Sequence, residues 1–137
     1  MKSAYRHFTK PSKAVETRVA KILSTLTLEE KIDILGGVDK GTREIAGKFP
    51  QIKFADGPVG VHWWREKSTA YPALIALASS WDKELAYKVG WALGRDCRAV
   101  GVHVLLAPGV NIYRSAYCGR NFEYLGEDPA LASKMVV

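Results

Sequence analysis

The run VHVLLAPGV, residues 102–110, is almost continuously apolar and follows directly on Gly101. A short run of this kind is typical of a parallel strand that is covered on both faces. Upstream, between a plausible helix cap at Asp82 and a stop at Gly101, apolar residues repeat about every four positions: Leu85, Val89, Leu93, Cys97 and Val100. Further upstream, KFADGP (53–58) indicates a short strand that ends in a turn. The order strand, helix, strand predicts a βαβ unit over about residues 52–108, with parallel strands and a right-handed crossover.

Polar side chains follow the carboxyl ends of both predicted strands. Asp56 ends the first strand, and the segment from Asn111 to Glu123 comes after the second. In βαβ units and in closed (β/α)8 barrels, binding sites form at this edge of the sheet. We therefore expect Asp56 to border a site together with an active-site loop over residues 109–129. An aspartate before a glycine is also a common turn former, so Asp56 has a purely structural alternative.

The stretch YCGRNFEYLGEDP, residues 117–129, concentrates charged and aromatic side chains in a segment without helical or strand periodicity. Within it, Arg120 and Glu123 lie three positions apart in a glycine-flanked loop. A planar guanidinium suits bidentate contacts to carboxylates or to neighbouring hydroxyls. An internal Arg–Glu ion pair is the alternative, and both interpretations remain open at this point. The rings of Trp81 and Trp91, by contrast, are expected to pack against other apolar side chains.

The flanking segments predict helices. Residues 11–26 carry apolar side chains at helical spacing, and TLEE (27–30) has the form of a capping box. N-terminal helices are therefore expected over about residues 11–36, followed by a loop over residues 38–51. A last helix is expected to start at Asp128, where a proline follows the aspartate.

Composition and charge restrict the class of protein. The chain has 137 residues, of which 47% are apolar and 25% charged, and this composition is typical of a soluble globular domain. No apolar run approaches the ~20 residues that span a bilayer, so no membrane partner is expected. No signal peptide is visible, which favours a cytoplasmic protein. The net charge of +6 contains no dense basic run, so no nucleic-acid partner is expected either.

The cysteines and histidines do not indicate a metal centre. The two cysteines, Cys97 and Cys118, are too few for a disulfide scaffold, and Cys97 is expected to be a reduced core thiol. His7, His62 and His103 show no ligand spacing. We therefore expect neither a metal nor another cofactor.

Five segments, taken in order, carry a resemblance to a known family. They are TLEEKI (27–32), FADGPVGV (54–61), YPALIALASSWD (71–82), LAPGVNIYR (106–114) and CGRNFEYLGEDP (118–129). Their order and spacing resemble the start of glycoside hydrolase family 3, which holds β-glucosidases, β-xylosidases and related exo-acting enzymes. The resemblance implies an α/β fold, a TIM-like (β/α)8 barrel, of which residues 1–137 would be the N-terminal fragment.

The resemblance implies roles only for residues that match the family's motifs. Asp56 matches the aspartate of DGP and Arg120 the arginine of GRNFE, and the resemblance implies that both line the subsite for the terminal non-reducing sugar. Asn111, Arg114 and Glu123 are expected to support the loop. The family hydrolyses glycosides with retention through a carboxylate nucleophile and a carboxylic acid/base. The resemblance places both beyond this chain, so no catalytic residue is expected within it and the chain alone is expected to be inactive.

The implied partners are a small β-glucoside or gluco-oligosaccharide, together with the remainder of the barrel and the domains that follow it. His62, Tyr113 and Ala116 depart from the family's pattern, which leaves the bracing of the first loop and the preferred sugar open. Two other classes of function remain as alternatives. One is a non-catalytic carbohydrate-binding remnant, and the other is a basic nucleic-acid-binding module.

Overall fold

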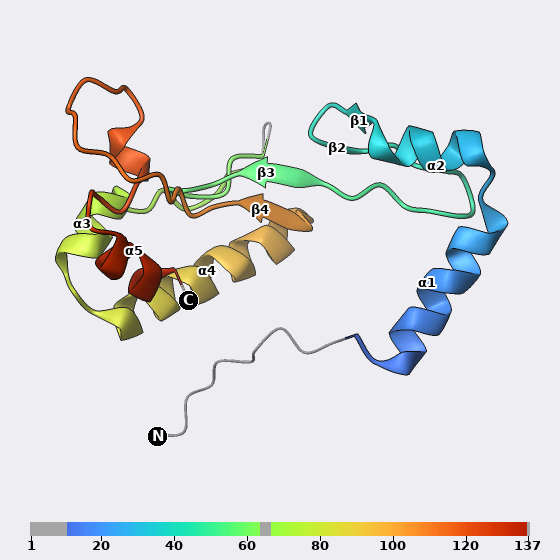
Figure 1. The fold of residues 1–137 in the computed structure, drawn as a ribbon, viewed down its shortest axis with the longest axis horizontal. Coiled ribbons are helices and arrows are strands. Elements are labelled where there is room, and N and C mark those ends of the chain that lie inside the picture. Colours follow the sequence, from blue (N-terminus) through green and yellow to red (C-terminus); the bar gives the residue numbers. More distant parts are fainter. Residues whose placement is uncertain (1–10, 64–66, 137) are drawn as a thin grey trace. The chain divides into compact units, whose positions relative to one another are not determined.

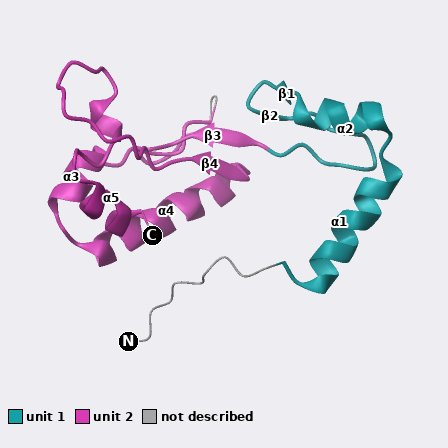
Figure 2. Ribbon diagram, in the orientation of Figure 1, with its two compact units in different colours: residues 1–52 teal, residues 53–137 magenta. Residues whose placement is uncertain are grey.

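The computed structural model describes residues 11–63 and 67–136. The chain divides into two compact units, Met1–Ile52 and Lys53–Val137 (Figure 2). The first unit begins with α1 (Lys13–Thr25), whose N-cap Ser12 accepts a hydrogen bond from the amide of Val15. This helix confirms the prediction made from the helical spacing of its apolar residues.

The second helix, α2 (Leu28–Leu35), begins with the predicted capping box. The Thr27 hydroxyl accepts from the Glu30 amide at 3.2 Å, and the Glu30 carboxylate accepts from the Thr27 amide at 2.8 Å. The same carboxylate pairs with the Lys48 ammonium at 2.7 Å. The helix ends at Gly36, as the sequence predicts.

Residues 38–51 are not simply a loop, which corrects the prediction. A short antiparallel hairpin pairs β1 (Gly37–Val38) with β2 (Gly41–Thr42). Its turn is possible because Asp39 adopts a positive φ of 51°, a conformation that aspartate tolerates better than most residues. The hairpin is also held from outside, since the Thr42 amide donates to the carbonyl oxygen of Ile52 at 2.9 Å.

The second unit contains the predicted βαβ arrangement (Figure 1). Its strands, β3 (Phe54–Asp56) and β4 (Val104–Leu106), are parallel. The crossover helix α4 (Lys83–Val100) is capped by the Asp82 carboxylate and ends at Gly101 with a φ of 73°. The helix packs on the strands through a common core, formed by Ala55, Val61, Leu93, Cys97 and Val102. The predicted helix at Asp128 is also present, as α5 (Pro129–Met135).

Two elements of this unit were not predicted. The first is α3 (Leu74–Ser79), a six-residue helix without a side-chain cap, which packs with Leu125 and Met135 in a second core. The second is the 3-10 helix η1 (Asn121–Glu123), where the sequence shows no helical period. Both are short elements whose apolar or buried residues contact distant parts of the chain.

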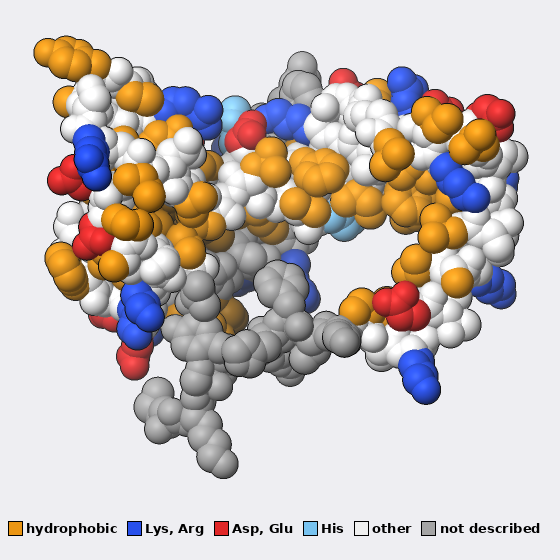
Figure 3. Space-filling view, viewed as in Figure 1, with side chains coloured by type: hydrophobic (Ala, Val, Ile, Leu, Met, Phe, Trp, Pro, Cys, Tyr) orange, Lys and Arg blue, Asp and Glu red, His pale blue; other side chains and the backbone are white. Residues whose placement is uncertain are grey.

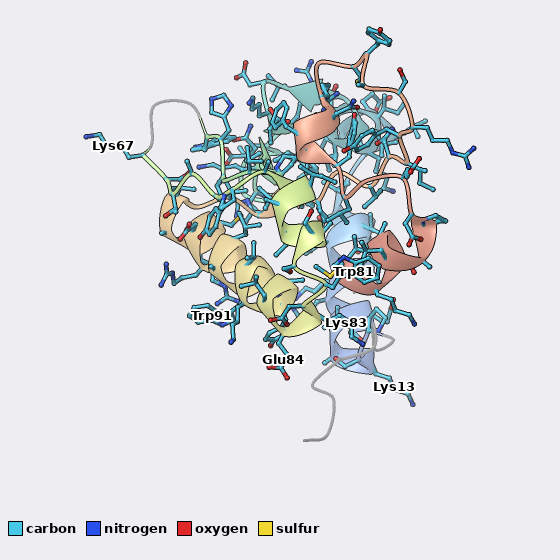
Figure 4. All side chains as sticks on the ribbon, turned by 90° about the vertical axis from the view of Figure 1, so that its left-hand side faces the viewer. Lys13, Lys67, Trp81, Lys83, Glu84 and Trp91 are labelled. Atoms are coloured by element: carbon cyan, nitrogen blue, oxygen red, sulfur yellow. The ribbon has the colours of Figure 1, made fainter. Side chains whose placement is uncertain are left out.

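The burial of strand β4 and of two tryptophans differs from expectation, whereas that of Cys97 agrees with it. The strand β4 was expected to be covered on both faces, but Val104 is 39% and Leu106 53% exposed. Trp81 and Trp91, expected to pack, are 73% and 62% exposed (Figure 4). Cys97 is buried and reduced, as predicted.

Apolar side chains also remain on the surface of the first unit, over α1 and α2 (Figure 3). Several of them line an apolar hollow of about 360 Å³ together with Phe49. Within the described residues, no helix combines the length and the apolar character that a membrane crossing requires. Nor do three or more histidine, cysteine or acidic side chains gather around a possible metal ion in this part of the chain.

Candidate functional site

The two parallel strands bring Asp56 to the edge of the sheet where the loop after β4 begins. Asp56 is the last residue of β3 and is exposed. It lies in register with Leu106, the last residue of β4. Because the carboxyl ends of parallel strands form binding sites in α/β folds, this register confirms the common edge that the sequence predicts.

The turn after β3 folds back on the strand and places His62 beside Asp56. The His62 amide donates to the Asp56 carbonyl oxygen at 2.7 Å, in an antiparallel bridge. Two glycines permit the turn: a Cβ on Gly57 would overlap the Leu105 side chain, and Gly60 has a φ of 133°. His62 was not predicted to lie next to Asp56, although the spacing of these two glycines was the available signal.

The segment after β4 leaves the sheet and then returns to it. Gly109 forms a parallel bridge with Tyr124, and a Cβ on Gly109 would overlap the carbonyl oxygen of Glu123. The intervening residues 110–120 are largely exposed, including Asn111 and Arg114. The supporting role of Asn111 and Arg114 therefore stays a prediction, whereas Glu123 is fixed against the strand end.

Arg120 and Glu123 form an ion pair in which Nε of Arg120 donates to Oε1 of Glu123. The Glu123 side chain is 10% exposed and the Arg120 side chain 71%. The pKa of Arg120 is raised, mainly by this hydrogen bond and also by the charge of Glu123. Of the two interpretations that the sequence left open, the internal pair is present. It engages Nε of the guanidinium, while the side chain as a whole stays largely exposed.

Asn121 braces the same turn and was not singled out from the sequence. Its Nδ2 donates to the carbonyl oxygen of Ser115 at 2.9 Å, which closes the loop from residue 115 to residue 121. Its Oδ1 is buried and has no hydrogen-bond donor among the residues that the structure describes. The signal available in the sequence was an asparagine within the glycine-flanked motif GRNFE.

The sequence of the chain matches a family whose members hydrolyse glycosides. The sequence model described as "Glycosyl hydrolase family 3 N terminal domain" matches residues 10–137. Thermostable beta-glucosidase B of Acetivibrio thermocellus is 42% identical over 130 residues, which cover 85% of this chain and 17% of that protein. Beta-glucosidase BoGH3A of Bacteroides ovatus is 41% identical over 137 residues, which cover 90% and 18%. The chain thus spans less than a fifth of the length of these curated relatives.

Solved structures agree with this match. Beta-glucosidase 3B from Thermotoga neapolitana, in complex with alpha-D-glucose, superposes with a TM-score of 0.78 at 39% identity. The superposition covers 86% of this chain and 20% of that chain. The beta-glucosidase from Kluyveromyces marxianus, in complex with glucose, gives a TM-score of 0.80 at 32% identity over 85% of this chain and 15% of that chain. Since the family's sequence model covers nearly all of its residues, the chain belongs to glycosyl hydrolase family 3.

Proposed function

We propose that the complete protein carrying this chain hydrolyses terminal non-reducing β-D-glucosyl residues, and that this chain supplies part of its sugar-binding subsite. The observation that carries the proposal is the exposed guanidinium of Arg120, held by Glu123, in a chain 42% identical to a β-glucosidase. A guanidinium fixed at one edge can orient two neighbouring oxygens of a sugar with its other nitrogens. The substrate in this proposal is a small β-glucoside or a gluco-oligosaccharide.

Asp56 and Arg120 have complementary roles in the proposed subsite. The Asp56 carboxylate accepts hydrogen bonds from sugar hydroxyls, and the Arg120 guanidinium donates to sugar oxygens. A hydroxyl both donates and accepts, so it can bridge an acceptor and a donor of this kind. Asn111 and Arg114 belong to the proposed loop around the sugar.

The proposed chemistry is hydrolysis with retention of configuration. One carboxylate attacks the anomeric carbon while a carboxylic acid protonates the leaving oxygen, and water then cleaves the glycosyl–enzyme bond. We assign neither role to this chain. Glu123 is buried against Arg120, and its engaged carboxylate serves the arginine rather than the reaction. The reacting pair, about 5–5.5 Å apart in retaining enzymes, is assigned to the remainder of a TIM-like (β/α)8 barrel and its following domains.

The test is turnover by the complete protein with an aryl β-D-glucoside, next to the matching β-D-xyloside and α-D-glucoside. We expect the β-glucoside to be cleaved fastest, with β-glucose as the first product in a time-resolved NMR experiment. If α-glucose appears first, retention is wrong. If glucose or gluconolactone binds without any turnover, the protein is a carbohydrate-binding remnant and not a hydrolase.

A further inference from the structure

Glu123, in the second unit, carries a buried carboxylate that has no role in the proposed chemistry. Among the residues that the structure describes, Glu123 is the only charged or polar one that is buried, with 7% exposure. Burial of a carboxylate is unfavourable unless a cation or several hydrogen-bond donors compensate it. The compensation here comes from Arg120, three residues earlier in the chain.

The pair is asymmetric in a way that suits a ligand. Oε1 of Glu123 accepts from Nε, the guanidinium nitrogen closest to the arginine backbone. An arginine side chain has five N–H donors, so four remain on the two terminal nitrogens. The side chain that carries them is 71% exposed, whereas that of Glu123 is 10% exposed. The buried end of the pair thus holds the guanidinium, and the other end is accessible.

The backbone of Glu123 is itself held against Gly109, in the segment that follows β4. Its carbonyl oxygen lies so close to Gly109 that a Cβ at that glycine would overlap it. Tyr124, the next residue, pairs with Gly109 in a parallel bridge. Leu125 follows and lies in the core with Leu74. The backbone of Glu123 is therefore anchored to the segment that follows β4, unlike the exposed loop that precedes Arg120.

We propose that Glu123 is a positioning residue for Arg120. It fixes the guanidinium by Nε, so that the terminal nitrogens can donate to two neighbouring oxygens of the bound sugar. A free arginine side chain has many rotamers, and a ligand that must order them binds more weakly. This inference rests on the proposed function, because Arg120 must contact the substrate for its orientation to matter.

The experiment is a double-mutant cycle in the complete protein, with an aryl β-glucoside as substrate. The single variants are Glu123→Gln, Glu123→Ala and Arg120→Ala, and each Glu123 variant is combined with Arg120→Ala. Glu127→Gln is the matched control, since Glu127 is an exposed glutamate of the same loop. Both kcat and KM are measured, together with the thermal unfolding of each variant.

We expect Glu123→Ala to lower kcat/KM by about tenfold or more, as for the loss of one charge-assisted hydrogen bond. Glu123→Gln keeps an acceptor oxygen and should recover part of the loss. In the Arg120→Ala background, either Glu123 change should lower kcat/KM by less than about twofold, because its effect passes through the arginine. The kcat/KM of Glu127→Gln should equal that of the wild-type protein.

Three outcomes would overturn the inference. The first is normal kcat/KM in both Glu123 variants. The second is an equal loss with and without Arg120, which would make Glu123 a scaffold residue only. The third is an unchanged kcat/KM in Arg120→Ala, because Arg120 would then not contact the sugar and Glu123 would have nothing to position. Absence of hydrolysis by the wild-type protein is a different result, which contradicts the proposed function itself. If Glu123→Ala does not fold, the isosteric Glu123→Gln cycle decides by the same criteria.

Discussion

Asp56 and Arg120, the two proposed sugar contacts, are held by different physical means. Asp56 has a short side chain on the last residue of β3, whose backbone is fixed by pairing to Leu106 and His62. Its short side chain has few rotamers, so the paired strand limits where the carboxylate can lie. Arg120 has a long side chain on an exposed turn and forms an ion pair with Glu123. In the proposed subsite, the acceptor Asp56 thus lies on a paired strand, and the donor Arg120 is paired with a buried carboxylate.

Removing either group should impair the complete protein. We expect Asp56→Ala and Arg120→Ala each to lower kcat/KM for an aryl β-glucoside by at least about tenfold, since charge-assisted contacts to sugar hydroxyls strengthen in the transition state. Steady-state kinetics with a series of substrate concentrations measures this. Arg98→Ala is the control, because Arg98 is an exposed arginine on α4. Losses below tenfold at both positions would contradict the proposed subsite.

The two thiols of the chain should react at very different rates. Cys118 is exposed, whereas Cys97 is buried in α4. The pKa of the Cys97 thiol is raised, first by burial and then by the charge of Asp96. Because the thiolate is the reactive species, we expect an alkylating reagent at pH 8 to label Cys118 first. Mass spectrometry of the peptides should find Cys97 labelled only after denaturation. Equal labelling of both cysteines in the folded protein would contradict the packing of α4.

At the scale of elements, Glu30 of the α2 capping box also forms an ion pair with Lys48. The pKa of Glu30 is lowered, first by the hydrogen bond from Lys48 and then by that from the Thr27 amide. A carboxyl whose pKa is lower in the folded state stabilises the fold above its unfolded pKa of about 4.3. That contribution is lost as the pH falls through the lower folded pKa.

Thr27→Ala removes the cap hydroxyl and should lower the free energy of unfolding by about 1 kcal/mol. Glu30→Gln tests the charge. The stability difference between the unchanged protein and Glu30→Gln should be constant near pH 7 and shrink below about pH 4. Circular dichroism melts at several pH values measure both changes, and other acidic groups cancel in the difference. If this stability difference stays constant down to pH 3, the ionisation of Glu30 does not contribute to the stability of the fold.

Elements with local signals could be predicted from the sequence. The helix α4 has an aspartate cap, a four-residue repeat and a glycine stop, all of which lie within or next to it. The capping box of α2 is likewise contained in four residues. The parallel pairing of β3 with β4 followed from the order of the elements, because a helical crossover leads to a parallel strand.

Elements that depend on distant contacts could not be predicted. The helix α3 has no cap and is stabilised by a core that includes Leu125 and Met135, far along the chain. The hairpin β1–β2 depends on Ile52, which lies outside it. In the site, the edge at Asp56 was predicted because strand order determines it. The bracing by Asn121 and the position of His62 depend on backbone turns that no periodicity indicates.

At the scale of the whole molecule, each unit leaves apolar surface open. In the second unit, a hollow of about 420 Å³ lies between α3, α4 and α5 and the end of β4. The exposed faces of Val104 and Leu106 add to the apolar surface of that unit. Large contiguous apolar surfaces are rare on soluble monomers and usually mark contacts with other protein segments. In the proposed barrel, the remaining strands and helices cover these surfaces and also supply the two reacting carboxylates.

The 137-residue chain alone should therefore lack hydrolase activity and expose apolar surface. We expect no turnover of an aryl β-glucoside by the purified chain, and strong fluorescence of a dye that binds apolar surfaces, such as ANS. The complete protein, prepared in parallel, should hydrolyse the glucoside and bind little dye. Measurable turnover by the isolated chain would place at least one reacting carboxylate within it. In that case Asp56, the exposed carboxylate at the strand edge, would be the first residue to test as the nucleophile, because Glu123 is committed to Arg120.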